Sequence, residues 1–199
     1  MKNLAVIPAR GGSKRISKKN IKLFKNKPMI AWSIEAAKNS KCFDEILVST
    51  DDKGIAAISE EYGANVPFLR PKELSDDFTP THSVIEHAIN WLYDNKISYE
   101  NVCCIYPTSV LINPNIIRKA YSKFKKDNSN MLISLCPFSN PPDRAFEIKK
   151  NNVRLTNIEN QNKRSQDLKK KYFDTGTLYF FKLKNFLKKN ELFPKKMSY

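Results

Sequence analysis

One segment near the start of the chain indicates the fold: Leu4-Ala5-Val6-Ile7-Pro8-Ala9-Arg10-Gly11-Gly12. Its first four residues form a continuous apolar run, which is typical of a strand buried on both faces of a parallel sheet. A proline and two glycines follow, and such residues end a strand and allow a tight loop. The segment therefore predicts a strand that leads directly into a loop at the carboxyl edge of a parallel sheet.

The rest of the chain continues this alternation of strand and helix. Apolar runs predict strands over residues 45–50, 102–106, 131–136, 145–148 and 177–181, with a brief extended piece at 66–69. Apolar residues at helical spacing predict helices around residues 30–37, 55–62, 81–92, 114–124 and 183–189. The order predicts an α/β fold with an open, mostly parallel sheet and helices on both faces. We find no internal repeat and no linker, so we expect one domain over residues 1–199.

The net charge is strongly positive and unevenly distributed. The formal charge of the 199 residues is +15, with 28 Lys and 7 Arg. Residues 1–100 carry 15 basic and 13 acidic side chains, whereas residues 101–199 carry 20 and 7. A basic half is compatible with a nucleic-acid-binding protein. The excess of Lys over Arg equally indicates a compositional bias, because Arg is the residue favoured for gripping phosphate.

Composition excludes several other classes of protein. No apolar run approaches the roughly 20 residues that span a bilayer, and the N-terminus lacks a secretory apolar region. We therefore expect a soluble, cytoplasmic protein. The four cysteines show no zinc-ligand spacing, and Cys103 and Cys104 lie inside an apolar run as small buried residues. His82 and His87 are five residues apart, which does not stack them on one helix face.

The loop after the first strand concentrates cationic side chains. Two glycines allow its backbone N–H groups to approach an anion. Its spacing matches neither the Walker A loop nor the GxGxxG dinucleotide loop. It predicts a phosphate-binding loop of another type, and the alternative is a tight basic turn without a ligand. The cations are Arg10, Lys14, Arg15, Lys18 and Lys19.

Four motifs occur in order over nearly the whole chain. They are Ile7-Pro8-Ala9-Arg10-Gly11-Gly12-Ser13-Lys14 with Lys19-Asn20, Val48-Ser49-Thr50-Asp51-Asp52, Pro107-Thr108-Ser109, and Arg164-Ser165-Gln166-Asp167 with Asp174-Thr175-Gly176 and Tyr179-Phe180. Together they resemble the cytidylyltransferases that activate nonulosonic, or sialic-type, acids. The resemblance implies a three-layer αβα, Rossmann-like nucleotidyltransferase fold.

Within that family the chain looks most like the enzymes for pseudaminic acid. The segments that carry this likeness are Phe68-Leu69-Arg70-Pro71, Cys103-Cys104-Ile105-Tyr106-Pro107 and Arg164-Ser165-Gln166-Asp167-Leu168. Tyr106 stands where enzymes for N-acetylneuraminate usually carry Gln, which disfavours that acid. N-acetylneuraminate, legionaminate and Kdo remain the alternative substrates.

The resemblance implies transfer of CMP from CTP to the anomeric hydroxyl of the acid, with release of pyrophosphate. Such a displacement at phosphorus needs positioning and charge stabilisation more than covalent catalysis. Arg10, Lys14 and Lys19 are implied as the catalytic cations. The nucleotide-binding set is Ala9, Arg10, Gly11, Gly12, Ser13, Lys14, Lys19, Asn20, Thr108 and Ser109.

The late motif and Tyr106 are implied as the side that binds the acid. Arg164 can fork to the sugar carboxylate, and Gln166 and Asp167 can pair with amide or hydroxyl groups. Asp174 either contacts sugar hydroxyls or caps a turn. Asp51 and Asp52 either line the pocket or form a turn.

One part of the family pattern is missing from the printed chain. Family members run on to a closing I-D-I-D-x-x-x-D-[WF] segment whose aspartates are expected to hold Mg²⁺, whereas this sequence stops at Tyr199. We therefore expect a chain truncated at its C-terminus, with Asp51, Asp52 or Asp174 as alternative ligands. Family members are commonly dimers, so we expect a homodimer, with no nucleic acid or membrane as partner. The alternatives are an inactive nucleotide-binding remnant and a basic RNA-binding protein.

Overall fold

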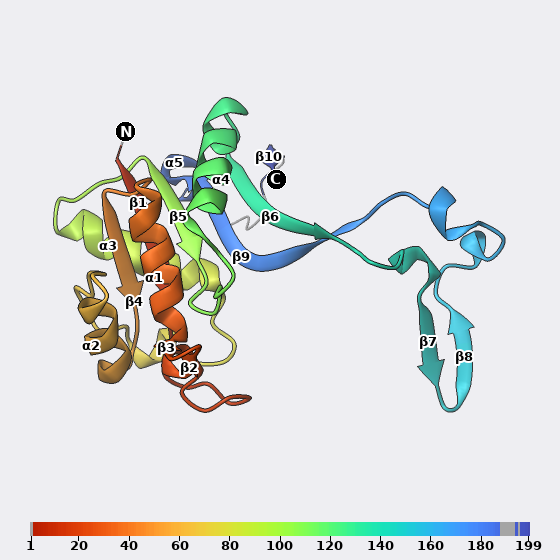
Figure 1. Ribbon diagram of the computed structural model, residues 1–199, viewed down its shortest axis with the longest axis horizontal. Coiled ribbons are helices and arrows are strands. Elements are labelled where there is room, and N and C mark those ends of the chain that lie inside the picture. Colours follow the sequence, from red (N-terminus) through yellow and green to blue (C-terminus); the bar gives the residue numbers. More distant parts are fainter. Residues whose placement is uncertain (1, 188–193, 195) are drawn as a thin grey trace. The chain divides into compact units, whose positions relative to one another are not determined.

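The computed structural model describes residues 2–187, 194 and 196–199 (Figure 1). The strands are β1 (Asn3–Pro8), β2 (Leu23–Phe24), β3 (Lys27–Pro28), β4 (Glu45–Ser49), β5 (Asn101–Ile105), β6 (Met131–Pro137), β7 (Phe146–Lys149), β8 (Asn152–Leu155), β9 (Tyr172–Lys182) and β10 (Met197–Ser198). The α-helices are α1 (Met29–Ser40), α2 (Lys53–Glu61), α3 (Thr81–Asp94), α4 (Pro114–Lys126) and α5 (Leu183–Phe186). Residues 188 and 189 of the helix expected over 183–189 lie outside the described residues.

A six-stranded sheet forms the centre of the described chain, in the order β10-β6-β9-β5-β1-β4. β1 pairs in parallel with β4 on one side and with β5 on the other, and β10 pairs in parallel with β6. β9 runs antiparallel to β5. The prediction of an α/β fold with a mostly parallel sheet is confirmed.

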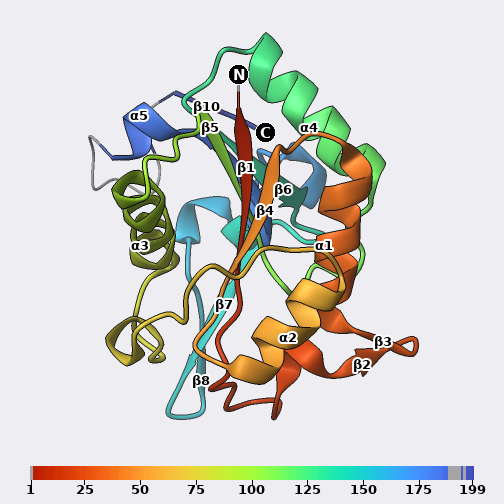
Figure 2. The ribbon, with the colours of Figure 1, turned by 90° about the vertical axis from the view of Figure 1, so that its left-hand side faces the viewer.

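Helices cover both faces of this sheet (Figure 2). Successive side chains of a strand point to opposite faces, so each strand contributes to two cores. Ala5 and Ile7 of β1 pack with the buried residues of α1, α2 and α4. Leu4 and Val6 of the same strand pack with the buried face of α3. Successive side chains of one continuous apolar strand thus pack against helices on opposite faces, which gives the three-layer arrangement. No helix of the described chain is long and apolar enough to cross a membrane.

Polar side chains that precede two helices fix where those helices begin. The Asp52 carboxylate accepts a hydrogen bond from the N–H of Ile55 at 2.9 Å, at the start of α2. Asn113 does the same for the N–H of Ile116 at 3.1 Å, and Pro114 occupies the first turn of α4. Such caps satisfy N–H groups that have no partner within the helix.

The chain divides into two compact units, which we describe separately. The first comprises residues 1–133 and 176–199 and holds most of the sheet. The second comprises residues 134–175 and contains the hairpin of β7 and β8. The sequence pattern did not set residues 134–175 apart, because they contain no linker composition and no second set of long apolar runs.

The strand expected over residues 145–148 is present as β7, but neither of the two hairpins in the structure was predicted, and both omissions have the same cause. β2–β3 turns through Lys25-Asn26, and β7–β8 turns through Lys150-Asn151, with positive φ at all four residues. Positive φ at both central residues defines the type I′ turn that suits hairpins. The usual signal for this turn is Asn-Gly or Asp-Gly, and here Lys-Asn replaces it.

Candidate active site

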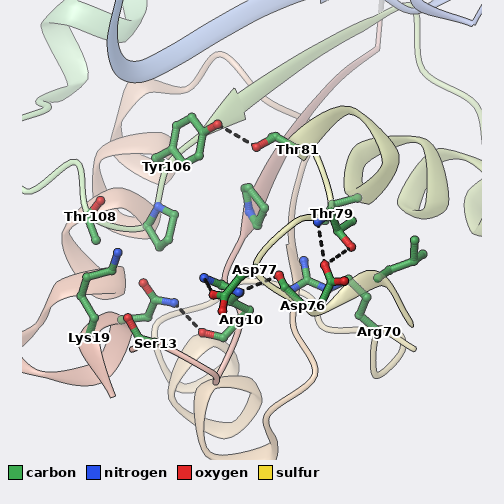
Figure 3. Close-up of a pocket in the computed structure, with 15 residues that line it drawn as sticks. Arg10, Ser13, Lys19, Arg70, Asp76, Asp77, Thr79, Thr81, Tyr106 and Thr108 are labelled. Atoms are coloured by element: carbon green, nitrogen blue, oxygen red, sulfur yellow. Dashed lines mark hydrogen bonds and ion pairs between the residues drawn. The ribbon is translucent and has the colours of Figure 1, made fainter. Parts of the chain in front are cut away.

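A cavity of about 230 Å³ lies in the first unit, where loops follow the carboxyl ends of the parallel strands (Figure 3). This edge of an open α/β sheet is the usual place for a ligand. The loop after β1 supplies Arg10, Ser13, Lys19 and Asn20, and the loop after β5 supplies Tyr106, Pro107 and Thr108. The segment between α2 and α3 supplies Arg70, Leu74, Asp76, Asp77 and Thr79. Pro8 of β1 and Thr81 and Val84 of α3 complete the lining.

Arg10 and Lys14 share one carboxylate. The Arg10 guanidinium lies 2.5 Å from one oxygen of Asp77, and the Lys14 ammonium pairs with the other oxygen. Arg10 also donates a hydrogen bond to the backbone carbonyl of Asp76 at 2.6 Å. Hydrogen bonds from Lys14 and Arg10 hold the pKa of Asp77 below its usual range. Both cations are thus held against the segment that carries Asp77, and Figure 3 shows the contacts of Arg10, whereas Lys14 does not line the cavity.

Asp76 folds the turn that presents Asp77. Its Oδ1 accepts hydrogen bonds from the N–H of Phe78 at 3.0 Å, and from the N–H and the hydroxyl of Thr79 at 2.6 Å each. The bonds from Thr79 and Phe78 lower the pKa of Asp76. An aspartate that binds the backbone two and three residues ahead is a common way to fix a turn. Sequence reasoning missed both aspartates, because a polar segment such as residues 70–80 is normally read as a solvated loop.

Asn20 is a buried polar residue of the site. Its side-chain amide donates to the carbonyl of Arg10 at 2.9 Å, which ties the end of the basic loop to its beginning. Its Oδ1 is buried and has no hydrogen-bond partner within the described structure. A buried polar atom without a partner is costly, so this acceptor is suited to a donor on a ligand. Lys19, the neighbouring residue, also lines the cavity.

Asp51 binds the backbone of the glycine loop, and Asp52 caps α2 next to it. Asp51 Oδ1 accepts the N–H of Gly11 at 2.9 Å, and Ser13 N–H donates to the carbonyl of Gly11 at 2.8 Å. The amides of Gly11 and Ser13 are therefore already engaged within the protein. Neither aspartate lines the cavity. Of the two roles considered for them, the structure supports the turn.

Arg70 is a buried cation that the list of candidate residues did not contain. It is 4% exposed, its Nε donates to the hydroxyl of Ser75 at 3.0 Å, and its guanidinium lies 3.8 Å from Asp51. Burial lowers the pKa of Arg70, and the Asp51 carboxylate opposes that shift. Its backbone N–H donates to the carbonyl of Thr50 at 2.7 Å, which brings residues 66–70 alongside β4. The extended piece expected over residues 66–69 could have pointed to Arg70, because Arg70 follows it at the edge of the sheet where the cavity lies.

The turn after β5 contributes residues with different surroundings. The Tyr106 hydroxyl is hydrogen-bonded to the Thr81 hydroxyl at 2.7 Å (Figure 3). The Tyr106 ring packs edge-on to that of Tyr179. Thr108 lines the cavity. Ser109 does not, because its hydroxyl donates to the carbonyl of Thr177 at 3.2 Å and holds the turn against β9.

The remaining candidates divide between the loop and the second unit. Ala9 is fully buried, and its N–H donates to the Ser49 carbonyl at 2.9 Å. Gly12 is exposed and lies outside the cavity lining. Four others are exposed residues of the second unit, described apart from the cavity: Arg164, Gln166 and Asp167 at a short 3₁₀ turn, and Asp174 in β9.

The expected burial of Cys103 and Cys104 is confirmed, and both histidines pack against aromatic rings. Cys103 and Cys104 are free, buried thiols, and burial raises their pKa values. The His87 ring packs edge-on to Phe68, and the His82 ring lies 4.2 Å from that of Phe186. Within the described part of the chain, no group of three or more His, Cys, Asp and Glu side chains is placed to hold a metal ion.

Comparisons with known proteins agree on one kind of enzyme. The family model described as "Cytidylyltransferase" matches residues 4–198. A pseudaminic acid cytidylyltransferase of Campylobacter jejuni is 45% identical over 194 residues, which cover 97% of this chain and 84% of that protein. A CMP-N,N'-diacetyllegionaminic acid synthase of Legionella pneumophila is 41% identical over 145 residues, 71% of this chain and 61% of that protein. A solved CMP:2-keto-3-deoxy-manno-octonic acid synthetase in complex with CTP shares the fold, with a TM-score of 0.69 at 18% identity, over 98% of this chain and 81% of that one.

The two glycines of the loop give a matched test of its packing. A Cβ added at Gly11 would lie 2.9 Å from atoms of the Asp52 side chain, whereas one added at Gly12 would have nothing within 4 Å. We expect Gly11→Ala to lower the free energy of unfolding by about 1–3 kcal/mol, since overpacking shifts the backbone. Gly12→Ala should stay within about 0.5 kcal/mol of the original chain. Urea unfolding followed by circular dichroism measures both, and equal values would contradict the packing described here.

Proposed function

The chain belongs to the cytidylyltransferase family, and on that premise we propose that it transfers CMP from CTP to the anomeric hydroxyl of pseudaminic acid. The observation that carries the proposal is the cavity at the carboxyl edge of the sheet, lined by Arg10, Ser13, Lys19 and Asn20 of the first family motif. Relatives that match most of this chain are named as enzymes for nonulosonic acids, and two from Campylobacter jejuni, at 45% and 44% identity, are named pseudaminic acid cytidylyltransferases. The family match includes the basic second half, which therefore needs no separate nucleic-acid function.

The cations of the basic loop suit the phosphates of CTP. In the reaction a bond forms between the anomeric oxygen and the α-phosphorus, and the bond to the β-phosphate oxygen breaks. Negative charge grows on the departing pyrophosphate, and fixed cations stabilise that charge. We assign this role to the side chains of Arg10, Lys14 and Lys19, with Ser13 as a further donor. The amides of Gly11 and Ser13 contribute less than expected from the sequence, because both already have partners.

Asn20, Thr108 and Tyr106 suit the rest of the two substrates. Asn20 Oδ1, which has no hydrogen-bond partner among the described residues, accepts a hydrogen bond from the nucleotide in this proposal, and Thr108 lines the same cavity. Tyr106 offers an aromatic ring and a hydroxyl where a Gln in other family members would offer an amide. Ser109 acts by holding the turn that carries Thr108, rather than by contact.

We assign recognition of the acid to the late motif as well. Arg164, Gln166 and Asp167 are exposed on the second unit, and a guanidinium can form paired hydrogen bonds to a sugar carboxylate. Asp174, also exposed, offers an acceptor to sugar hydroxyls. These assignments rest on the family motif and on exposure.

Mg²⁺ is the cofactor expected from the family, and the described residues do not form a protein cage for it. No described cluster of three or more ligating side chains is available. Asp51 and Asp52 each use an oxygen to accept a backbone N–H. Mg²⁺ commonly binds through substrate phosphates with one or two carboxylates. We propose that it enters with CTP.

We further propose a homodimer that involves the β7–β8 hairpin. The register places Phe146 opposite Leu155 and Ile148 opposite Val153, so these four side chains share one face. Three of them are strongly exposed, at 61% for Phe146, 77% for Ile148 and 65% for Val153. An isolated two-stranded hairpin is marginal in water, so a covered apolar face would stabilise it. A second copy supplies the same apolar face, as a two-fold interface requires.

A pyrophosphate-release assay tests the function. With CTP, Mg²⁺ and a panel of pseudaminic, legionaminic, N-acetylneuraminic and Kdo acids, we expect the fastest release with pseudaminic acid. A preference for another acid of the panel would contradict pseudaminic acid as the substrate but not the transfer of CMP. Saturable CTP binding without release would indicate an inactive remnant, and no CTP binding would contradict the function altogether.

A comparison of two arginines of the loop distinguishes a catalytic role of Arg10 from an effect of net charge. Arg10 lines the cavity, whereas Arg15 is exposed and does not. We expect Arg10→Ala to lower kcat by roughly 10²- to 10³-fold, because a fixed donor to the developing charge is lost. Arg15→Ala, which makes the same change in net charge, should retain turnover within a few-fold. Equal losses in the two variants would contradict the role of Arg10.

The hairpin offers a matched pair of double variants for the dimer. Ile148→Gln with Val153→Gln changes the directly opposed residues of the apolar face, and Glu147→Gln with Arg154→Gln changes those of the polar face. We expect only the first pair to shift the chain towards monomer in sedimentation equilibrium, since it removes apolar area from the interface. Dimers that survive the first pair would show that another surface holds them.

A further inference from the structure

The Asp77 carboxylate binds Arg10 and Lys14, the first two cations of the basic loop. One of its oxygens pairs with Arg10 and the other with Lys14, so both oxygens are used. These contacts join two segments about 65 residues apart in the chain, and Figure 3 shows Arg10 and Asp77 among the residues that line the cavity. A carboxylate and a phosphate oxygen demand the same donors from guanidinium and ammonium groups. A ligand phosphate and Asp77 therefore compete for these two side chains.

The turn that carries Asp77 is a built structure. Asp76 closes it by accepting hydrogen bonds from Phe78 and Thr79. The Ser75 hydroxyl, at the start of the turn, donates to the carbonyl of Pro71 at 2.9 Å and accepts from buried Arg70. The turn then passes directly into α3 at Thr81. Anchored at both ends, it presents the Asp77 carboxylate to the cations at a fixed position.

We propose that Asp77 is an internal competitor of the nucleotide triphosphate and of pyrophosphate for Arg10 and Lys14. The proposal rests on the function proposed above, which assigns these cations to the phosphates. A triphosphate carries several negative charges against the single charge of Asp77, so the nucleotide displaces the carboxylate when it binds. Pyrophosphate must later leave the same cations, and Asp77 is positioned to form its ion pairs with them again. The residue therefore weakens the binding of both phosphate ligands and speeds the release of the second.

The sign of the effect distinguishes this role from a structural one. If Asp77 merely positioned Arg10 and Lys14 for the phosphates, its removal would weaken phosphate binding. Because it competes instead, its neutralisation should strengthen the binding of CTP, of pyrophosphate and of inorganic tripolyphosphate. Exposed ion pairs are modest, so we expect dissociation constants lower by roughly 2- to 10-fold. The gain should shrink as salt rises, since ions screen an exposed pair.

The test compares Asp77→Asn with Glu73→Gln. Glu73 lies in the same segment, is exposed, and pairs with no cation among the described residues, so its substitution makes the same change in charge. Calorimetric titration with tripolyphosphate, pyrophosphate and CTP should give tighter binding for the Asp77 variant alone. Inhibition of turnover by added pyrophosphate should also strengthen in that variant. Asp77→Ser provides a second substitution if the amide finds new partners.

Each outcome bears on a separate claim. Equal or weaker binding of all three ligands by both Asp77 variants, in an active enzyme, would overturn the competition. Tighter binding by Glu73→Gln to the same degree would also overturn it, because net charge would then explain the gain. Tighter tripolyphosphate binding by the Asp77 variants, in a protein that releases no pyrophosphate from any acid, would support the competition and contradict the proposed function.

Discussion

β1 lies between β4 and β5, with Asn3 paired to Asn101 on one side and Pro8 paired to Ser49 on the other. A slip of one residue would exchange the two faces of the strand, so the register is fixed wherever both faces are buried. Asn3 adds a polar lock at the start of the strand. Its side chain donates to the Cys42 carbonyl at 2.9 Å and to the Tyr121 hydroxyl at 2.7 Å, and it accepts from Asn101 at 3.0 Å. Neighbouring elements are therefore fastened to β1 at its first residue.

The same register determines what happens at the other end of the strand. Backbone hydrogen bonds continue past the named strands, from Ala9 N–H to the Ser49 carbonyl and from Tyr106 N–H to the Thr177 carbonyl at 3.1 Å. The loops that follow thus leave the sheet from fixed points. Asp51, two residues beyond Ser49, then accepts a hydrogen bond from the N–H of Gly11. The sheet determines where the cavity-lining side chains lie. Ion pairs between loops determine which of the charged side chains are neutralised.

The sequence predicted the parts of the molecule that follow from periodicity. Leu4–Ile7 and the faces of α1, α3 and α4 were recognisable, because burial imposes apolar spacing on a strand or a helix. The basic loop was recognisable through its glycines and cations. Asp77 and Arg70 were not, since their roles come from pairings between distant segments that no local pattern records. The hairpin turns at Lys25-Asn26 and Lys150-Asn151 escaped notice for a different reason: neither contains the glycine that usually marks such a turn, and Lys rarely adopts the positive φ that it requires.

Local pairing also explains why net charge is a poor guide to this site. The second half of the chain carries most of the excess positive charge, yet the charged residues that line the cavity all belong to the first half, whose basic and acidic side chains nearly balance. There, Arg10 and Lys14 face Asp77, and Arg70 faces Asp51. Cations held by carboxylates are oriented before a ligand arrives, and a weak internal partner can be exchanged for a stronger external one. A site for a highly charged substrate that must also release a highly charged product benefits from such near-neutral pairs, because unopposed cations would bind both and retain them.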